Sequence, residues 1–360
     1  MLIDNAMWLV ENHIPLYDED TLISALELAI GECHRNGLTG IHDAGVSKDD
    51  IALYQRAIVA GKFNLRDYVF LKCDQGVYFC GDETSRVDEF EGRMTVRAVK
   101  MYLDGALGSW GAAMLEPYSD KPDSKGLLRM PVAELEPAVR KWVNLGFQVN
   151  THAIGDHANR VALDAYEKVI YDVGVDLRLR LRIEHAQIVS PKDFERFREL
   201  HVIPSVQPTH ATSDMAYAEK RLGHERIRGA YAWRTLAAQA EGHLPLSSDF
   251  PVEKMNPFHG IYAAVTRQDL SGQPAGGWYP EEKLTVLQAV RGFTTEAAYA
   301  AFQEDSLGSL VQGRRADFIV IDRDIIAGKP EDIPGTTVIT TFFDGNPVYG
   351  RRFEPTRKRM

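Results

Sequence analysis

The feature that most constrains this chain is a regular alternation of short apolar segments with longer segments of helical character. Seven segments resemble strands, near residues 40, 68, 100, 150, 183, 204 and 246, and helical segments follow most of them. One of these is PVAELEPAVRKWVNLG (131–146), which has proline in its first turn and glycine at its end. Because parallel strands need crossover connections of this length, the pattern predicts an α/β fold with a parallel sheet, of the size of a (β/α)8 barrel.

The C-terminal part of the chain has a different pattern. Residues 313–324 and 336–352 contain β-rich runs, and the DGN sequence between TTFF and PVYG is typical of a hairpin turn. We therefore expect two domains. Residues 1–312 form the barrel, and residues 313–360 form part of a small β domain beside it.

Composition excludes several classes of partner. The chain has 51 acidic and 41 basic residues, a formal net charge of −10, which argues against binding to nucleic acid or to an anionic membrane. No stretch approaches the roughly 18 apolar residues of a membrane span. The N-terminus lacks the basic start of a signal peptide. Three cysteines, Cys33, Cys73 and Cys80, are too few for a disulfide framework, so we expect a cytoplasmic protein.

Four strand-like segments end in a residue that can bind metal or carry charge. They are AVKMYLD with Lys100, VNTHAIGD with His152, RIEHAQ with His185 and LSSDFP with Asp249. Taken singly, a histidine in such a place commonly packs or faces solvent, and an aspartate commonly caps a helix or turn. In a parallel barrel, however, all strand C-termini open on the face that holds the active site. The four residues together therefore predict one site.

The residue types in this set indicate metal chemistry. Two imidazoles and a carboxylate suit a divalent cation, with Zn²⁺ favoured, and either one or two ions fit the set. A protonated Lys100 would repel a cation, but carbamylation by CO₂ would turn it into a carboxylate-like ligand. A metal lowers the pKa of bound water to about 7. Asp249 could then accept a proton from that water and pass it to a leaving nitrogen.

Several longer stretches resemble a known family. They are GLTGIHDAG, VKMYLDGALGS, GFQVNTHAIGD, RIEHAQIVSP, QPTHATSD, SSDFPVEKMNPF and LGSLVQGRRADFIVID. In their order and spacing they resemble the amidohydrolase superfamily, in the family 3 branch that includes N-substituted formamide deformylase-like proteins. The resemblance implies a distorted (β/α)8 barrel with metal at the strand tips. It also implies hydrolysis of amide-type, non-peptide C–N bonds by metal-activated water, with a small-molecule amide as substrate.

The resemblance also implies a role for individual residues. Lys100 would be the carbamylated bridging ligand, and His152 and His185 would bind the second metal. Asp249 would be a ligand of the first metal and the proton shuttle. A further set would line the substrate pocket, namely Asp104, Gly105 and His210.

One departure from the family pattern is large. The family's first strand ends in His-x-His, which supplies two ligands of the first metal, and no such motif occurs in this sequence. We therefore expect an incomplete barrel that lacks its first strand and leaves two unpaired sheet edges, which favour association, including formation of a homo-oligomer. A missed upstream start, a degenerate relative, or a second chain that supplies the strand would each explain this. Persistence of the four site residues favours the first explanation.

Two other functions compete with an amidohydrolase. The absent His-x-His motif favours a degenerate or truncated barrel relative that lacks the first metal site and has no catalytic activity. A phosphotriesterase-like or lactonase activity would use the same kinds of ligand, although the GRRADFIVID segment favours amides.

Overall fold

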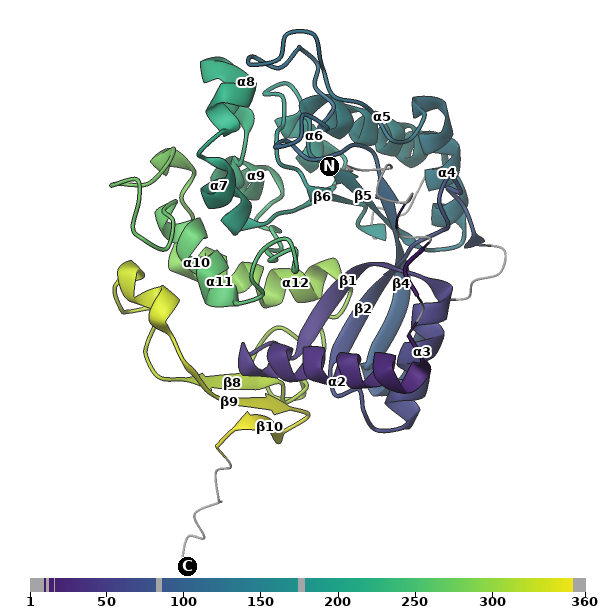
Figure 1. Ribbon diagram of the computed structural model, residues 1–360, viewed down its shortest axis with the longest axis vertical. Helices are drawn as coiled ribbons and strands as arrows, with labels where there is room; N and C mark the ends of the chain where they lie inside the picture. Colours follow the sequence, from purple (N-terminus) through teal and green to yellow (C-terminus); the bar gives the residue numbers. More distant parts are fainter. Residues whose placement is uncertain (1–9, 11–12, 16, 82–85, 174–178, 352–360) are drawn as a thin grey trace, which may run out of the picture.

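The computed structural model describes residues 10, 13–15, 17–81, 86–173 and 179–351. At its centre is a curled parallel sheet with the strand order β1-β2-β4-β5-β6-β7 (Figure 1). The strands are β1 (Gly40–Val46), β2 (Arg66–Leu71), β4 (Met94–Tyr102), β5 (Gln148–Ala153), β6 (Arg182–His185) and β7 (Ile203–Ser205). A short strand, β3 (Val87–Glu89), pairs antiparallel with β4. The parallel sheet expected from the sequence is thus confirmed.

The seventh expected strand, near residue 246, is reduced to a single parallel bridge between Val206 and Leu246. Two hydrogen bonds flank it, from Val206 N–H to Pro245 O and from Ser247 N–H to Val206 O. At the other side of the sheet, none of the described residues pairs with the outer edge of β1. The structure therefore confirms an incomplete (β/α)8-type barrel that is open between β1 and the segment 245–247.

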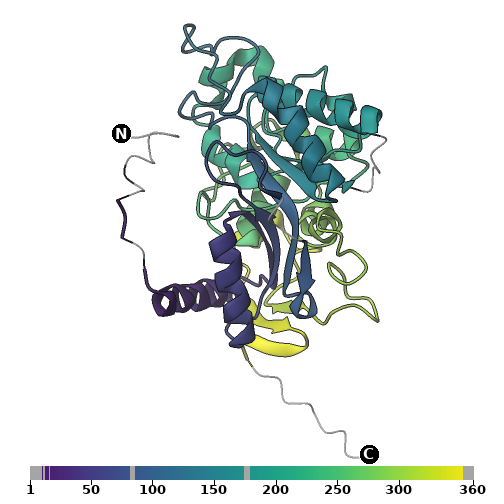
Figure 2. The same cartoon turned by 90° about the vertical axis from the view of Figure 1, so that its right-hand side faces the viewer.

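Helices surround the outside of the curled sheet (Figures 1 and 2). They are α2 (Glu19–Arg35), α3 (Lys48–Val59), α4 (Val132–Asn144), α5 (Asp156–Val173), α6 (Phe194–Glu199), α7 (Pro208–Asp214), α8 (Ala218–Arg226), α9 (Trp233–Gln239), α10 (Pro257–Thr266), α11 (Val286–Gly292) and α12 (Thr295–Ala300). Short 3₁₀ segments lie at Phe90–Gly92, Ile227–Gly229, Pro280–Glu282 and Pro330–Gly335. The stretch 282–301, whose sequence is helical in character, contains two helices, α11 and α12.

Local sequence explains where these helices begin. Ser47 and Asp50 form a capping box at the start of α3, and Thr285 and Gln288 form another at the start of α11. In each box the two side chains satisfy backbone N–H groups that have no partner inside the helix. Helix α4 turns an apolar face to the sheet, and its Trp142 and Val139 are fully buried.

The C-terminal segment forms a separate antiparallel sheet with the order β10-β9-β8. Its strands are β8 (Phe318–Ile321), β9 (Val338–Phe343) and β10 (Asn346–Gly350), and the expected turn lies at Asp344 and Gly345, both with positive φ. Arg66, at the start of β2, binds Asp317 at 2.6 Å and Asp344 at 2.5 Å. This buried contact joins the small sheet to the barrel. The boundary expected at residues 312 and 313 stays a prediction.

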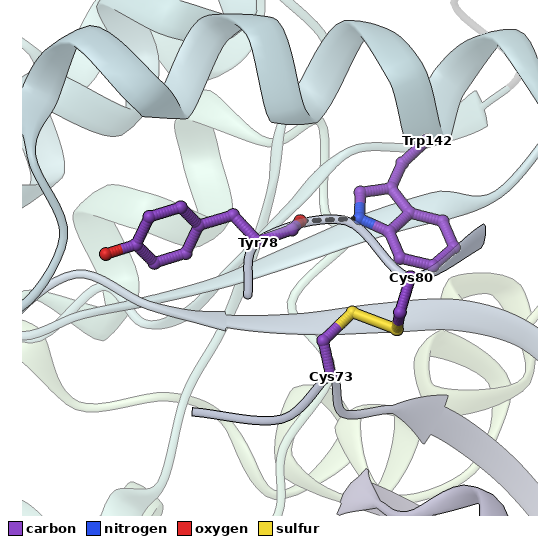
Figure 3. Close-up of a disulfide and its surroundings, with 4 residues drawn as sticks. All are labelled: Cys73, Tyr78, Cys80 and Trp142. Atoms are coloured by element: carbon purple, nitrogen blue, oxygen red, sulfur yellow. Dashed lines mark hydrogen bonds between the residues drawn. A yellow bond between two sulfur atoms is a disulfide. The ribbon is translucent and has the colours of Figure 1, made fainter. Parts of the chain in front are cut away.

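The cysteines differ from expectation. Cys73 and Cys80 form a disulfide (Figure 3). Cys33 is a buried free thiol. The argument from a sparse, odd number of cysteines failed because two residues only seven positions apart meet across one loop. The cysteine count therefore gives no support to a reducing compartment. Among the described helices, none combines the length and the apolarity that crossing a bilayer requires.

The disulfide closes the loop that leaves β2, and this loop packs on helix α4. Trp142 donates a hydrogen bond from Nε1 to Tyr78 O at 3.0 Å (Figure 3). The Phe79 ring meets the Trp142 ring edge-on, with 4.9 Å between ring centres. Together these contacts hold a connection that contains no α-helix in the part of it that the structure describes.

A buried carboxyl lies on β2. Asp67 is 1% exposed, and neither of its carboxylate oxygens has a hydrogen-bond partner among the described residues. Burial, followed by the nearby charge of Asp43, raises the pKa of Asp67 well above its usual range. Burial and the charge of Asp67 likewise raise the pKa of the Cys33 thiol to about 11. The charged form of Asp67 is therefore a cost to the folded state.

This cost predicts a pH dependence of stability. Because the pKa of Asp67 is raised on folding, the native chain holds a proton that the unfolded chain releases above a pH of about 4. The contribution of Asp67 to the free energy of unfolding should therefore fall as pH rises above about 4. Asp67→Asn should remove about 1–3 kcal/mol of that fall, measured by urea unfolding at several pH values. The exposed Asp305→Asn is the control, and equal pH profiles for both variants would contradict the prediction.

Candidate metal centre

Three side chains from separate segments meet at the C-terminal end of the sheet. They are His185 at the end of β6, His210 on α7, and Asp249 just after the bridged segment 245–247. One potential ligand atom from each lies within 4.8 Å of the others. His185 and Asp249 have φ values of +75° and +58°, which non-glycine residues adopt mainly where the surrounding structure imposes them. Two imidazoles and a carboxylate at this spacing can hold a divalent cation.

The two histidines of this cluster have different surroundings. His185 is buried, and its Nδ1 lies 2.8 Å from Gln207 Oε1. Burial, and then the charges of His152 and Lys100, lower the pKa of His185 well below its usual value, so its imidazole is neutral. His210 Nε2 is buried, has no hydrogen-bond partner in the part of the chain that the structure describes, and lies 3.5 Å from Asp249 Oδ2.

His152 and Lys100 lie beside this cluster, inside the barrel. The parallel register sets Tyr102 opposite His152 and Lys100 opposite Asn150. The His152 ring centre lies 4.4 Å from that of His185, and its Nε2 is buried and without a hydrogen-bond partner. Lys100 is buried, which lowers its pKa, while the charges of Glu184 and then Asp249 oppose that shift. Of the four predicted ligands, His185 and Asp249 belong to the three-residue cluster, and His152 and Lys100 flank it.

Asp104, predicted to contact substrate, anchors the loops around the site. It is fully buried, and its carboxylate accepts hydrogen bonds from the backbone N–H groups of Ala113, Ile154 and Gly155 at 2.8, 3.0 and 2.8 Å. His152 Nε2 lies 3.4 Å from Asp104 Oδ1. The carboxylate thus ties the loop after β4 to the turn after β5. This role was not apparent from sequence, because its hydrogen-bond donors are backbone groups.

The other two predicted pocket residues lie in different places. Gly105 is buried in the loop after β4, and its N–H donates to Gly111 O. His210 lies in the three-residue cluster rather than beside it. The signal for this in the sequence is Pro208, which begins a helix directly after β7 and so places His210 in its first turn. Substrate binding by Asp104, Gly105 and His210 stays a prediction.

Buried polar side chains line the barrel below the cluster. Arg182 Nε lies 2.9 Å from Glu184 Oε1, and Arg182 also contacts His42 Nδ1 and Ser205 Oγ. Asn150 is fully buried, and neither atom of its amide group has a hydrogen-bond partner. The interior near the site is therefore polar and charged rather than a closed apolar core.

Comparisons with known proteins agree on one protein family. The sequence model of the amidohydrolase family matches residues 1–349. The chain is 32% identical to Protein LONG AFTER FAR-RED 3 of Arabidopsis thaliana, with 97% of this chain and 61% of that protein covered. It is 27% identical to N-substituted formamide deformylase of Arthrobacter pascens, with 97% and 64% covered.

A solved structure shows the same likeness. The crystal structure of an uncharacterized metal-dependent hydrolase from Pyrococcus horikoshii has a TM-score of 0.77 and 28% sequence identity. The match covers 90% of this chain and 64% of that one. The chain thus spans less than two thirds of the length of each of these proteins.

The role of Asp104 in holding the loops after β4 and β5 gives a testable expectation. Asp104→Asn replaces one acceptor oxygen by an amide nitrogen that faces backbone N–H donors, so it should lower the free energy of unfolding by about 2–3 kcal/mol. Urea unfolding measures this loss. Asp123→Asn, an exposed change in the same connection between β4 and α4, should leave stability unchanged. A fully stable Asp104→Asn protein would contradict the anchoring role.

Proposed function

The chain belongs to the amidohydrolase family, and on this premise we propose that it is a metal-dependent hydrolase of amide-type, non-peptide C–N bonds in small molecules. The observation that carries the proposal is the meeting of His185, His210 and Asp249 within 4.8 Å. The likeness to a solved metal-dependent hydrolase supports the same reaction class. The deformylase similarity supports an amide as the substrate.

The residues present fit a divalent cation. His210 Nε2 is buried with no hydrogen-bond partner, which is costly unless a cation or another polar group satisfies it. His185 is engaged at Nδ1 and neutral, so Nε2 can act as a ligand. Nitrogen and carboxylate donors favour Zn²⁺ among common cations. A second ion would be held by His152 together with Lys100, if Lys100 is carbamylated.

Each side chain has a distinct task in the proposed reaction. A bound divalent cation supplies Lewis acidity, which polarises a carbonyl and acidifies water. Asp249, half-exposed, is the group at which a proton can be taken up on a carboxylate oxygen and returned to the leaving nitrogen. His210 Nε2 lies 3.5 Å from Asp249 Oδ2, close enough for both side chains to hold the same cation. Asp104 keeps the surrounding loops in place.

A non-catalytic barrel that binds metal or ligand without turnover is the second candidate. The observation that favours it is the outer edge of β1, which pairs with none of the described residues and leaves the barrel sheet incomplete. Both candidate functions use the same ligand cluster, and a hydrolysis assay distinguishes between them. A second copy of this chain is the proposed protein partner. Sedimentation or light scattering measures the oligomeric state.

Metal content tests the cluster directly. Purified protein loaded with Zn²⁺ and desalted should retain about one equivalent, measured by elemental analysis. The His210→Asn variant should lose most of this metal, because the substitution removes one of the three ligands. His224→Asn, a change at an exposed histidine, should retain it. Retention of metal by His210→Asn would show that His210 is not a ligand.

Hydrolysis tests the reaction class. N-substituted formamides and simple N-acyl amines should be cleaved by the metal-loaded chain, and Asp249→Asn should lower kcat by about 100-fold or more while the circular dichroism spectrum is unchanged. Equal rates for the two proteins would contradict proton transfer by Asp249. Bound metal without turnover of amides, lactones or phosphotriesters would favour the non-catalytic candidate.

A further inference from the structure

Gln207 contacts all three segments that carry the proposed ligands. It is 3% exposed and lies directly before helix α7. Its Oε1 lies 2.8 Å from His185 Nδ1, and its Nε2 donates to Ser247 Oγ at 2.9 Å. Its backbone carbonyl accepts a hydrogen bond from His210 N–H. Ser247 is two residues before Asp249, so one side chain and its own backbone link three separate parts of the chain.

The chemistry of the amide group sets the direction of these bonds. The NH₂ end of an amide only donates and its oxygen only accepts. With the NH₂ end engaged by Ser247, the oxygen faces His185, and a hydrogen bond there requires the imidazole proton to be on Nδ1. The lone pair of His185 then lies on Nε2, the nitrogen that is left for a cation.

We propose that Gln207 is a positioning residue that holds His185 in the tautomer with its proton on Nδ1 and joins the segments of His185, His210 and Asp249. The purpose of this arrangement rests on the proposed metal centre. The tautomer and the linkage, however, are properties of the metal-free chain.

If Gln207 served only to fill space, its side chain would not need an amide group. An apolar side chain of similar size would fill the space without the cost of burying an amide. Instead, both ends of the Gln207 amide are engaged, and Ser247 is fixed in turn by the bond from its N–H to Val206 O. Partners that orient a ligating imidazole in this way commonly change metal affinity by about 10–100-fold when they are removed.

The first experiment determines the tautomer of His185 in the absence of metal. Chain labelled with ¹⁵N-histidine is examined by two-bond ¹H–¹⁵N correlation spectra, with the His185 signals assigned from His185→Asn. The wild-type chain should show His185 protonated on Nδ1. Gln207→Leu should shift part or all of the population to the Nε2-protonated form. Gln207→Glu, which keeps an acceptor oxygen, should restore Nδ1 protonation, and Gln55→Leu on α3 is the control.

The second experiment measures the consequence for Zn²⁺ binding. Zn²⁺ affinity, measured by competition with a chelator, should fall about 10–100-fold in Gln207→Leu and much less in Gln207→Glu. Ser247→Ala, which is less disruptive, should give a smaller loss and guards against misfolding of Gln207→Leu. Equal Zn²⁺ affinity in the wild-type, Gln207→Leu and Ser247→Ala proteins would overturn the positioning role.

The two proposals fail in different ways. If the wild-type His185 carries its proton on Nε2, the inference about Gln207 is overturned whether or not metal binds. If His185 is protonated on Nδ1 and this depends on Gln207, but the wild-type chain binds no Zn²⁺, the inference stands and the metal-dependent function is overturned.

Discussion

The parallel register of β4, β5 and β6 is the constraint on which the candidate site depends. Parallel neighbours bring their C-terminal ends to one edge, and the register sets Tyr102 beside His152 and His152 beside Glu184. A shift of one residue in any of these strands would turn an ionisable side chain away from the barrel interior. The buried outer faces of the strands, such as Val99 and Val149, resist that shift.

Much of this arrangement can be predicted from the sequence. The alternation of strand-like and helical segments predicts the parallel sheet, and polar residues at strand ends predict the place where His185 and Asp249 meet, with His152 and Lys100 beside them. The DGN turn predicts the C-terminal hairpin. These features are local, or follow from a rule about strand ends, so one sequence without any structure is sufficient to find them.

Other features depend on contacts that no local pattern encodes. The hydrogen bonds that Asp104 accepts come from backbone groups as far as 51 positions along the chain. Gln207 carries no charge and matches no catalytic motif, yet it contacts three segments. The Cys73–Cys80 bond depends on how one loop folds back on itself. Tertiary structure is needed to recognise each of these.

The contact of Arg66 with Asp317 and Asp344 ties the first half of the chain to its last strands across more than 250 positions. Loss of the small sheet would leave a guanidinium, 4% exposed at its side chain, with neither of its counter-charges. Such an uncompensated charge costs about 3–5 kcal/mol, a large part of the stability of an ordinary domain. We therefore expect the two sheets to unfold together, because separating them would break this buried ion-pair network.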